Sequence, residues 1–511
     1  MRLDPVTLDI IWSRLIGICQ EAETAQMRTA FSLQVRESQD MCCVLTDARG
    51  DAVAQGFGRL PSIAVSVPLT VKNILKKYPV ESLEPGDILI TNLPWLATGH
   101  LWDNTVVEPV FHQGRLVALA GSMAHWPDIG GRGFSAETRS IYEEGLQLPI
   151  IKIAKRGQIN EEVLAIIREN VRVPEEVMGD FRAQLVANSL TRTRLLELLE
   201  TQGIADFDAL AETVQARSEA AMRNAIGQIP DGDYEHEVHI DGFDRPIIIK
   251  VKVTVRDSDI CVDYSGSSEQ SQYSINSPPN YSYAYTFFAI KSMVGPHLPF
   301  NSGPMRPVSV SLPLGTIVNP RGSVGMAARH LASNFFPCAV LGALSKAIPQ
   351  WAQAESVPLW PTAFTGHTAS GKPFVGRGLL SSGMGGRNGK DGISCSFFPG
   401  NMRSSPVETL ENRNPMLLVE RREIRTDSGG PGRYRGGCGQ HIDYRIVGKE
   451  TVEFSPAVDR IEFPAQGIFG GQSGARGSLT LNGDAIGGKR PVTLKGGDLL
   501  SLRTPGGGGF G

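Results

Sequence analysis

The stretch between residues 99 and 128 constrains the fold most strongly, because it predicts two strands that must lie side by side. Two apolar runs rich in β-branched residues, 105–111 and 116–124, are separated by the short break His-Gln-Gly-Arg. Such runs around a glycine-containing break are typical of a β-hairpin. A turn centred on Gln113 and Gly114 then brings the two outer ends of the runs together.

The same four-residue motif, His-x-x-Asp, stands at both outer ends of this predicted hairpin. One copy is His100 and Asp103, and the other is His125 and Asp128. The turn described above places His125 opposite Trp102, beside Asp103. Two imidazoles and two carboxylates at one end of a hairpin suit a divalent metal ion. One copy alone is common by chance, and a lone histidine is more often a packed residue, so the hypothesis depends on both copies converging.

The composition is that of an ordinary globular protein. A chain of 511 residues is expected to form two or three domains. Hydrophobic residues make up 41% and charged residues 20%, and the net charge of -3 without a basic block argues against a general nucleic-acid binder. The 57 glycines and 33 prolines favour many turns and long loops over a helical bundle.

The cysteines and the apolar runs indicate in which cellular compartment the protein is expected. Seven cysteines are scattered without a Cys-x-x-Cys pair, which favours free thiols in a reducing environment. The amino-terminal sequence has no basic region followed by a long apolar core, and no apolar run approaches the length of a membrane span. We therefore expect a cytoplasmic protein without a membrane segment.

The first quarter of the chain mixes helices and strands. A helix begins at Asp4-Pro5, which supplies an N-cap and a first-turn proline. Residues 31–55 predict two strands around a turn, with Asp40 in the first of them. A short helix over 68–78 and a strand over 88–90 precede the hairpin.

The middle of the chain is first helical and then alternating. Apolar residues recur at helical spacing from about 174 to 202 and again from 206 to 226, with charged outer faces, which predicts a helical hairpin. Alternating strands follow over residues 236–240, 247–255 and 260–264.

The last third, from Pro304 on, is rich in glycine and proline, with short strands and one helix over 336–348. We expect the glycine-rich end, 505–511, to be frayed. The fold class predicted is a mixed multi-domain α+β protein that is rich in β-structure. The predicted regions are a metal-site α+β region over 1–170, a helical hairpin over 171–229, and a β-rich region with few helices over 230–511.

No nucleotide site is predicted. Gly366 and Gly371-Lys372 match the beginning of a phosphate-binding loop, but Pro373 replaces the Ser or Thr that would hold magnesium, and no strand-to-helix pattern surrounds them. The run over 427–439 lacks the βαβ context of a dinucleotide site. Neither a Gly-x-Ser-x-Gly motif nor a distinctive cysteine indicates a nucleophile.

Eight segments, in order along nearly the whole chain, resemble the hydantoinase B/oxoprolinase family. They are TNLPWLATGHLWDNTVVEPVF, AHWPDIGGRGFS, IYEEGLQLP, VRVPEEVMGDFRAQ, VDYSGSS, RPVSVSLPLGTIVNP, DSGGPGRYRGGCG and TPGGGGFG. The family includes B-type subunits of ATP-dependent N-methylhydantoinases and lactamases, the carboxyl-terminal part of eukaryotic 5-oxoprolinase, and a large subunit of acetone-type carboxylases.

The resemblance implies a metal centre and a partner. It implies Asp40, His100, Asp103 and His125 as ligands of one divalent ion, either Zn, Mn or Fe, with Asp128 as an alternative ligand or a residue that orients one. It also implies a separate A-type subunit that binds ATP and phosphorylates the substrate or bicarbonate. We expect a hetero-oligomer with at least two copies of each chain.

The function implied is ATP-dependent hydrolysis of a cyclic amide, with opening of a hydantoin, 5-oxoproline or lactam ring. The general base is Asp128, Glu143 or Glu144, although the two glutamates are equally typical of a solvated surface pair. One alternative is a subunit of an ATP-dependent ketone carboxylase of the acetone or acetophenone type, and another is a metal-free scaffold. Asn92-Leu93-Pro94 departs from the Asn-Asp-Pro of many members, which leaves the substrate open.

Overall fold

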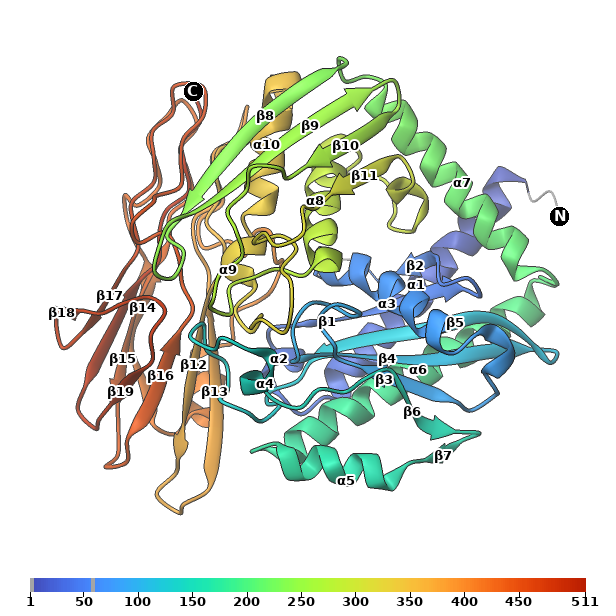
Figure 1. Cartoon of the computed structure of the whole chain (residues 1–511), viewed down its shortest axis with the longest axis horizontal. Coiled ribbons are helices and arrows are strands. Elements are labelled where there is room, and N and C mark those ends of the chain that lie inside the picture. Colours follow the sequence, from blue (N-terminus) through green and yellow to red (C-terminus); the bar gives the residue numbers. More distant parts are fainter. Residues whose placement is uncertain (1–3, 57–59) are drawn as a thin grey trace.

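The computed structural model describes residues 4–56 and 60–511, and in them helices pack around four separate β-sheets (Figure 1). The sheets contain seven, four, four and five strands among the described residues. This arrangement confirms the predicted mixed α+β fold. The division of the chain at residues 170 and 229 stays a prediction. None of the described helices is long and apolar enough to cross a membrane.

The seven-stranded sheet carries the predicted hairpin at its centre. Its strand order is β2-β1-β5-β4-β3-β6-β7. The strands are β1 (Met41–Asp47), β2 (Ala52–Gln55), β3 (Ile88–Thr91), β4 (Asp103–His112), β5 (Arg115–His125), β6 (Ile151–Lys155) and β7 (Gln158–Ile159). One face packs on α3 (Pro61–Lys77), and the other packs on α1 (Pro5–Thr29) and α6 (Pro174–Thr201). The central strands are therefore buried on both faces.

Helix α1 begins where the sequence predicted. The Asp4 carboxylate accepts hydrogen bonds from the backbone N–H groups of Val6 and Thr7, both at 3.0 Å, and Pro5 occupies the first turn. Its inner face packs along α6 and against β1 and β2.

Two predictions in the first quarter were wrong in their boundaries. Residues 33–36 form the short helix α2 (Leu33–Arg36), which begins at the Ser32 cap, so Asp40 lies just before β1 instead of inside a strand. Helix α3 begins at Pro61, and Pro68 lies inside it. The apolar residues Ile63 and Val67 extend the buried face across that proline, and their burial offsets the hydrogen bond that proline removes.

The predicted hairpin forms, but its register differs by one residue. Gln113 and Gly114 have φ values of 50° and 78°, as a two-residue hairpin turn with two positive φ angles requires. An irregularity between Val110 and Phe111 shifts the pairing beyond it. Asp103, and not Trp102, is therefore the residue directly opposite His125.

The second sheet, in the order β11-β10-β9-β8, packs against α10, which in turn packs on α8. The elements between residues 141 and 348 are α4 (Ile141–Glu144), α5 (Glu161–Asn170), α6, α7 (Phe207–Ile226), β8 (Gly232–Ile240), β9 (Ile247–Arg256), β10 (Asp259–Asp263), α8 (Pro279–Val294), β11 (Val308–Ser311), α9 (His330–Ser333) and α10 (Phe336–Ala347), with short 3-10 turns η1 (Val80–Ser82), η2 (Gly303–Met305) and η3 (Pro349–Trp351). The two predicted long helices are confirmed as α6 and α7. Helix α7 packs closely on η2.

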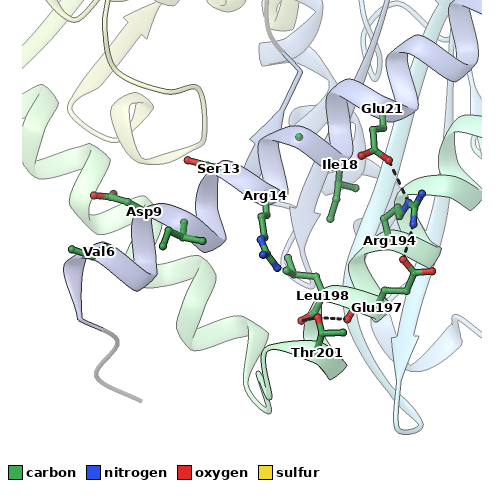
Figure 2. A pocket seen from close by; sticks show the side chains of 12 residues that line it. Val6, Asp9, Ser13, Arg14, Ile18, Glu21, Arg194, Glu197, Leu198 and Thr201 are labelled. Carbon is green, nitrogen blue, oxygen red and sulfur yellow. Dashed lines mark hydrogen bonds and ion pairs between the residues drawn. The ribbon is translucent and has the colours of Figure 1, made fainter.

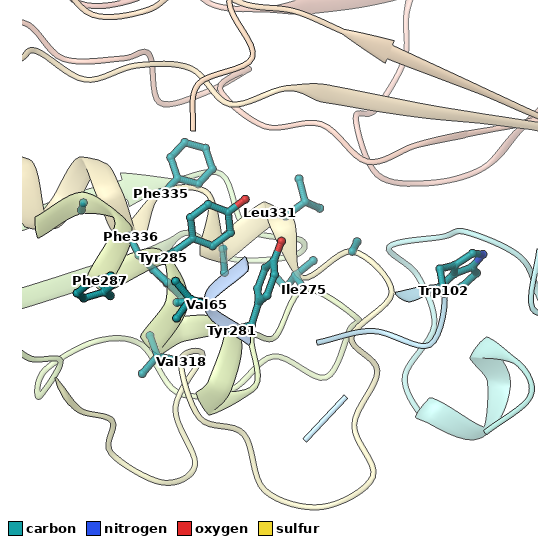
Figure 3. Close-up of a cluster of buried hydrophobic side chains, with 14 of the residues drawn as sticks. Val65, Trp102, Ile275, Tyr281, Tyr285, Phe287, Val318, Leu331, Phe335 and Phe336 are labelled. Atoms are coloured by element: carbon teal, nitrogen blue, oxygen red, sulfur yellow. The ribbon is translucent and has the colours of Figure 1, made fainter. Parts of the chain in front are cut away.

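Aromatic side chains from α8 and α10 fill the core between this second sheet and the seven-stranded sheet (Figure 3). Tyr281 and Tyr285 of α8 are buried, and Figure 3 shows their hydroxyl groups directed to the same side. Phe335 and Phe336 lie beside them. Trp102, which lies inside the first motif, belongs to the same cluster, so the predicted site borders the main core.

The carboxyl-terminal strands form the two remaining sheets, which stand beside one end of the seven-stranded sheet (Figure 1). Their elements are β12 (Trp360–His367), β13 (Pro373–Leu380), α11 (Val407–Arg413), β14 (Leu417–Ile424), β15 (Gln440–Ile446), β16 (Val452–Pro456), β17 (Ser478–Leu481), β18 (Asp484–Ala485), β19 (Val492–Leu494) and β20 (Leu499–Arg503). Gly371 lies in the turn between β12 and β13, so the phosphate-loop match is part of a β-hairpin.

The glycine-rich end is not frayed, which corrects the prediction for residues 505–511. Residues 505–510 are buried, and each N–H from Gly506 to Gly511 donates a hydrogen bond to a carbonyl elsewhere in the chain. A Cβ at Gly506 would lie 1.8 Å from the Ser428 carbonyl oxygen, and one at Gly508 would lie 2.0 Å from that of Gln466. The glycines let backbones pack directly on one another, which local composition could not reveal.

Candidate metal centre

Three predicted ligands meet at the open end of the hairpin. His100 lies in the loop before β4, Asp103 is the first residue of β4, and His125 is the last of β5. The Asp103 Oδ1 atom lies 3.0 Å from both His100 Nε2 and His125 Nδ1, and these two nitrogens are 3.2 Å apart. All three side chains are buried. We refer to His100, Asp103 and His125 as the His–Asp cluster.

Asp40 lies at the edge of this cluster. The antiparallel pairing of β1 with β5 brings the chain just before Met41 beside His125. The backbone N–H of His125 donates to the backbone carbonyl oxygen of Asp40 at 3.0 Å. The Asp40 carboxylate is 3.6 Å from His125 Nδ1. The structure therefore places next to the cluster the one predicted ligand that only the family resemblance had implied.

The surroundings set the charge of each group. Burial and the nearby Arg329 guanidinium lower the pKa of His100 to about 4, and burial and Arg377 hold the pKa of His125 well below its usual range. Burial works against ionisation of Asp103, but the Arg329 guanidinium and a hydrogen bond from His125 help to lower the pKa of that carboxyl. Both imidazoles are thus neutral beside a carboxylate, which is the protonation that metal binding requires.

Asp40 differs from Asp103 in its charge. Burial, followed by the charge of Asp103, raises the pKa of Asp40 to about 7, although Arg329 and Arg377 oppose this shift. At neutral pH the Asp40 carboxyl is therefore partly protonated beside the ionised Asp103. A divalent cation would remove this repulsion.

The residues present fit a divalent metal ion. Ligand atoms bound to one ion at about 2.0–2.1 Å lie roughly 3.0–3.4 Å from one another, as the three donor atoms here do. The Nδ1 atom of His100 faces the Ala327 carbonyl oxygen at 3.0 Å. It donates there, so the Nε2 lone pair points into the cluster. Two nitrogens with one or two carboxylates suit Zn, Mn or Fe.

Two arginines that the sequence analysis did not single out complete the site. Arg329 donates to Asp103 Oδ2 at 2.5 Å and lies 3.9 Å over the Tyr281 ring. Arg377 of β13 donates to His125 Nε2 and lies 3.9 Å over the Phe134 ring. A Cβ at Gly99, whose φ is 117°, would approach Arg329 Nε to 2.7 Å, so glycine makes room for this contact.

The arginines were missed because no local pattern marks them. They lie 226 and 252 residues from Asp103 and His125 in the sequence. Only the meeting of the N-terminal sheet, the segment before α9 and the β12–β13 hairpin brings them to the cluster. These parts, together with the start of α3 and Tyr281 and Tyr285 of α8, line a cavity of about 60 Å³ beside it.

Asp128 is buried but bound elsewhere. Its Oδ1 atom accepts from the Arg172 guanidinium at 2.7 Å and from the Gly130 N–H at 3.2 Å, and its Oδ2 atom accepts from the Arg172 N–H at 2.5 Å. None of its hydrogen bonds within the described residues reaches the His–Asp cluster. Asp128 therefore holds the glycine-rich loop, and its role as a base or ligand stays a prediction.

The two glutamates lie in different environments. Glu143 is exposed and lines no part of the cavity. Glu144 is buried, and its Oε1 atom accepts from the N–H groups of Met326 and Ala327 at 2.6 and 2.8 Å. The carbonyl of the same Ala327 faces His100 Nδ1. Glu144 therefore helps to hold in place the backbone group that orients His100. A base must lie within hydrogen-bond reach of its proton or one water away, and no contact supports that role for Glu143.

Glu144 should make stability depend on pH. Burial raises its pKa to about 7 from 4.5, so the folded state binds this proton more tightly than the unfolded state does. The stabilisation is complete below about pH 4.5 and is lost as pH rises to about 7, by at most about 3 kcal/mol. Urea unfolding at pH 5 and pH 8 should show a smaller difference for Glu144→Gln than for the wild type. Glu143→Gln is the control, and parallel pH profiles for all three proteins would refute the assignment.

A larger groove lies on the surface, away from the cluster. Its volume is about 820 Å³, and it lies between α1 and α6 (Figure 2). Arg194 bridges Glu21 and Glu197 there, at 3.3 and 2.9 Å. Ile10 is exposed on its wall. It holds no His–Asp constellation, so its size does not make it the candidate site.

Comparison with known proteins identifies the family. The family model described as hydantoinase B/oxoprolinase matches residues 4–511. The chain belongs to this family. A relative from Pseudomonas sp. (strain NS671), provisionally named as the B-type chain of a D-/L-hydantoinase, is 30% identical over 100% of this chain and 90% of its own length. An uncharacterized relative from Methanocaldococcus jannaschii is also 30% identical, over 100% of this chain and 91% of its own length.

Longer family members contain a region equivalent to this chain. The 5-oxoprolinase 1 of Arabidopsis thaliana is 28% identical over 99% of this chain, which matches 42% of that protein. The fold is shared with the crystal structure of ATP-dependent caprolactamase from Pseudomonas jessenii, with a TM-score of 0.90, 24% identity, and coverage of 100% of this chain and 92% of that one. Nucleotide-free acetone carboxylase gives a TM-score of 0.86 at 18% identity, with coverage of 99% and 76%.

Proposed function

We propose that this chain is the metal-containing B-type subunit of an ATP-dependent cyclic amide hydrolase that opens a hydantoin, 5-oxoproline or lactam ring. The observation that carries the proposal is the buried His–Asp cluster, with neutral imidazoles and an ionised carboxylate, in a member of a family with relatives named for hydantoinase and 5-oxoprolinase activity. A scaffold subunit would have no need to bury such a set of groups.

His100, Asp103 and His125 would hold the ion, with Asp40 as the fourth residue in reach. A bound divalent ion polarises an oxygen ligand and lowers the pKa of a bound water molecule. The chain's own side chains prepare the site for this chemistry. Arg329 keeps Asp103 ionised, the Ala327 carbonyl fixes the orientation of His100, and apolar residues such as Leu60 and Ile63 in the cavity wall exclude bulk water.

ATP would be bound by an A-type partner subunit. Amide resonance makes a cyclic amide a poor electrophile, and phosphorylation of its oxygen on the partner would supply a leaving group. The phosphate-loop match in this chain lies in a hairpin turn, which is not the strand-to-helix setting of a nucleotide site. The proposed assembly is therefore a hetero-oligomer in which the activated ring passes to this chain.

Reconstitution with the A-type chain tests the proposal. The complex with Mn²⁺ or Zn²⁺ is supplied with ATP and caprolactam, hydantoin or 5-oxoproline, with and without labelled bicarbonate. We expect ATP-dependent ring opening that does not require bicarbonate, and no phosphate release by this chain alone. In a parallel reaction that contains acetone or acetophenone and labelled bicarbonate, labelled carbon retained in a keto acid would instead indicate the carboxylase. Phosphate release by the isolated chain, beyond contaminant controls, would contradict the assignment of ATP binding to the partner.

A further inference from the structure

Three side chains that line the cavity beside the His–Asp cluster have buried polar atoms without a hydrogen-bond partner in the described part of the chain. These atoms are Nε of Arg329, Nη2 of Arg377, and both amide atoms, Oδ1 and Nδ2, of Asn334. Asn334 is only 1% exposed. A buried polar group that is left unpaired destabilises the folded state. Several such atoms around one cavity indicate a polar ligand that pairs with them.

Arg377 also forms no direct ion pair within the described residues. The charge of Arg329 is paired with Asp103, whereas no carboxylate among the described residues lies within ion-pair distance of Arg377. Its guanidinium packs over the Phe134 ring and contacts a neutral imidazole, that of His125. With a divalent ion bound, the ion, Arg329 and Arg377 would carry four positive charges. Ionised Asp40 and Asp103 would supply only two negative charges. A dianion is the ligand that restores balance.

We infer that Arg377 and Asn334 form the substrate-binding half of the site. Arg377 binds the phosphoryl oxygens of an activated substrate, and the Asn334 amide pairs with the amide atoms of its ring. A guanidinium presents a planar set of donors that matches phosphate oxygens, and a primary amide offers both a donor and an acceptor. The remaining wall, with Leu60, Ile63, Leu359 and Leu379, suits an apolar ring. This inference rests on the proposed function and names its substrate class, a small phosphorylated cyclic amide.

The contact between Arg377 and His125 suggests how the arginine becomes available. Arginine only donates, so this contact uses the lone pair of His125 Nε2. When His125 binds an ion through Nδ1, its Nε2 atom carries the ring proton and becomes a donor. Two donors cannot pair, and Arg377 then turns to the cavity. Arg377 thus competes with the ion for His125. Once an ion is bound, the Arg377 guanidinium is free to bind the phosphoryl oxygens of the substrate.

The first test measures anion binding directly. Calorimetric titration of methyl phosphate into the full chain, loaded with Mn²⁺ to equal content in every variant, should show binding to the wild type. Arg377→Gln should weaken it at least about 10-fold, the loss expected for one hydrogen bond to a charged group, and Arg377→Lys should weaken it less. The control Arg445→Gln removes a partly exposed ion pair with Glu420, and neither residue lines the cavity. Wild-type binding in Arg377→Gln, or no binding to the wild type, would overturn the inference.

A second readout separates substrate binding from support of the fold. Arg377→Gln should hold Mn²⁺ at least as tightly as the wild type, because a competitor for His125 is removed. Weaker metal binding would make Arg377 a support of the cluster and would refute its assigned role. Asn334→Leu should melt at the wild-type temperature or above, because it removes an unpaired buried amide of similar volume. A clearly lower melting temperature would show that the Asn334 amide stabilises the fold and would refute its role in binding.

The outcome for the proposed function is distinct. If the reconstituted complex opens no cyclic amide but methyl phosphate binding depends on Arg377, the proposed function is wrong and the anion site remains. If the complex is active and Arg377→Gln retains the wild-type KM and kcat, the anion site is wrong and the proposed function remains.

Discussion

His100→Ala and His125→Ala should each lose the metal ion and the activity of the complex while the fold is retained. Each substitution removes one of three donor atoms that lie within 3.2 Å of one another. Changes to groups that merely support a ligand typically cost about 10-fold to 100-fold in metal affinity or activity, so loss of a ligand should cost at least about 100-fold. Metal content after dialysis, measured by elemental analysis, is the direct readout.

The same hairpin offers a matched control. His112 lies at the opposite end of β4, where it pairs with Arg115 at the turn. His112→Ala should keep both metal and activity. Circular dichroism should show the same fold for all three variants. Full metal occupancy in both His100→Ala and His125→Ala would exclude the cluster as the metal site, and loss of the fold in both would make the site structural and leave catalysis unexplained.

The glycine-rich carboxyl-terminal segment should be as sensitive to substitution as a hydrophobic core. In Gly508→Ala the new methyl group would meet the Gln466 carbonyl oxygen at 2.0 Å, and in Gly506→Ala it would meet that of Ser428 at 1.8 Å. A side chain can rotate away from such a contact, but a hydrogen-bonded backbone cannot. We therefore expect a loss of about 3 kcal/mol or more in stability, at the upper end of the cost of overpacking. Thermal melting followed by circular dichroism, together with the soluble yield, measures it.

Gly487→Ala is the control for this prediction. Gly487 has open space where the Cβ would stand, and its φ is not in the left-handed region. The variant should melt within about 0.5 kcal/mol of the wild type in stability, as most surface substitutions do. A wild-type melting temperature for Gly506→Ala and Gly508→Ala would show that the segment is as loosely held as its composition suggested.

Much of the site was predictable from sequence because it is local. The two motifs stand at the ends of one hairpin, and Gly114 suits one of the two positive φ angles of a two-residue turn. Helical periodicity likewise predicted α6 and α7 nearly to the residue. In each case, the structure depends on residues that are close in the sequence. The spacing of their apolar and turn-forming side chains therefore indicates which element they form. The resemblance to the family added Asp40, which no local pattern connects to the hairpin.

Other features depended on which surfaces meet. The irregularity beside Val110 shifts the strand register, so that the cross-strand partner of His125 is Asp103 and not Trp102. The alternation of apolar residues along a strand does not encode this shift. Arg329 and Arg377 reach the cluster only because distant segments close around it. The glycines of the carboxyl-terminal segment are ordered because other backbones cover them. Spacing along the chain thus determined the hairpin, the long helices and the convergence of His100, Asp103 and His125. Strand register, charge pairing and backbone packing were decided by the tertiary structure, because their energies arise between residues that the sequence keeps far apart.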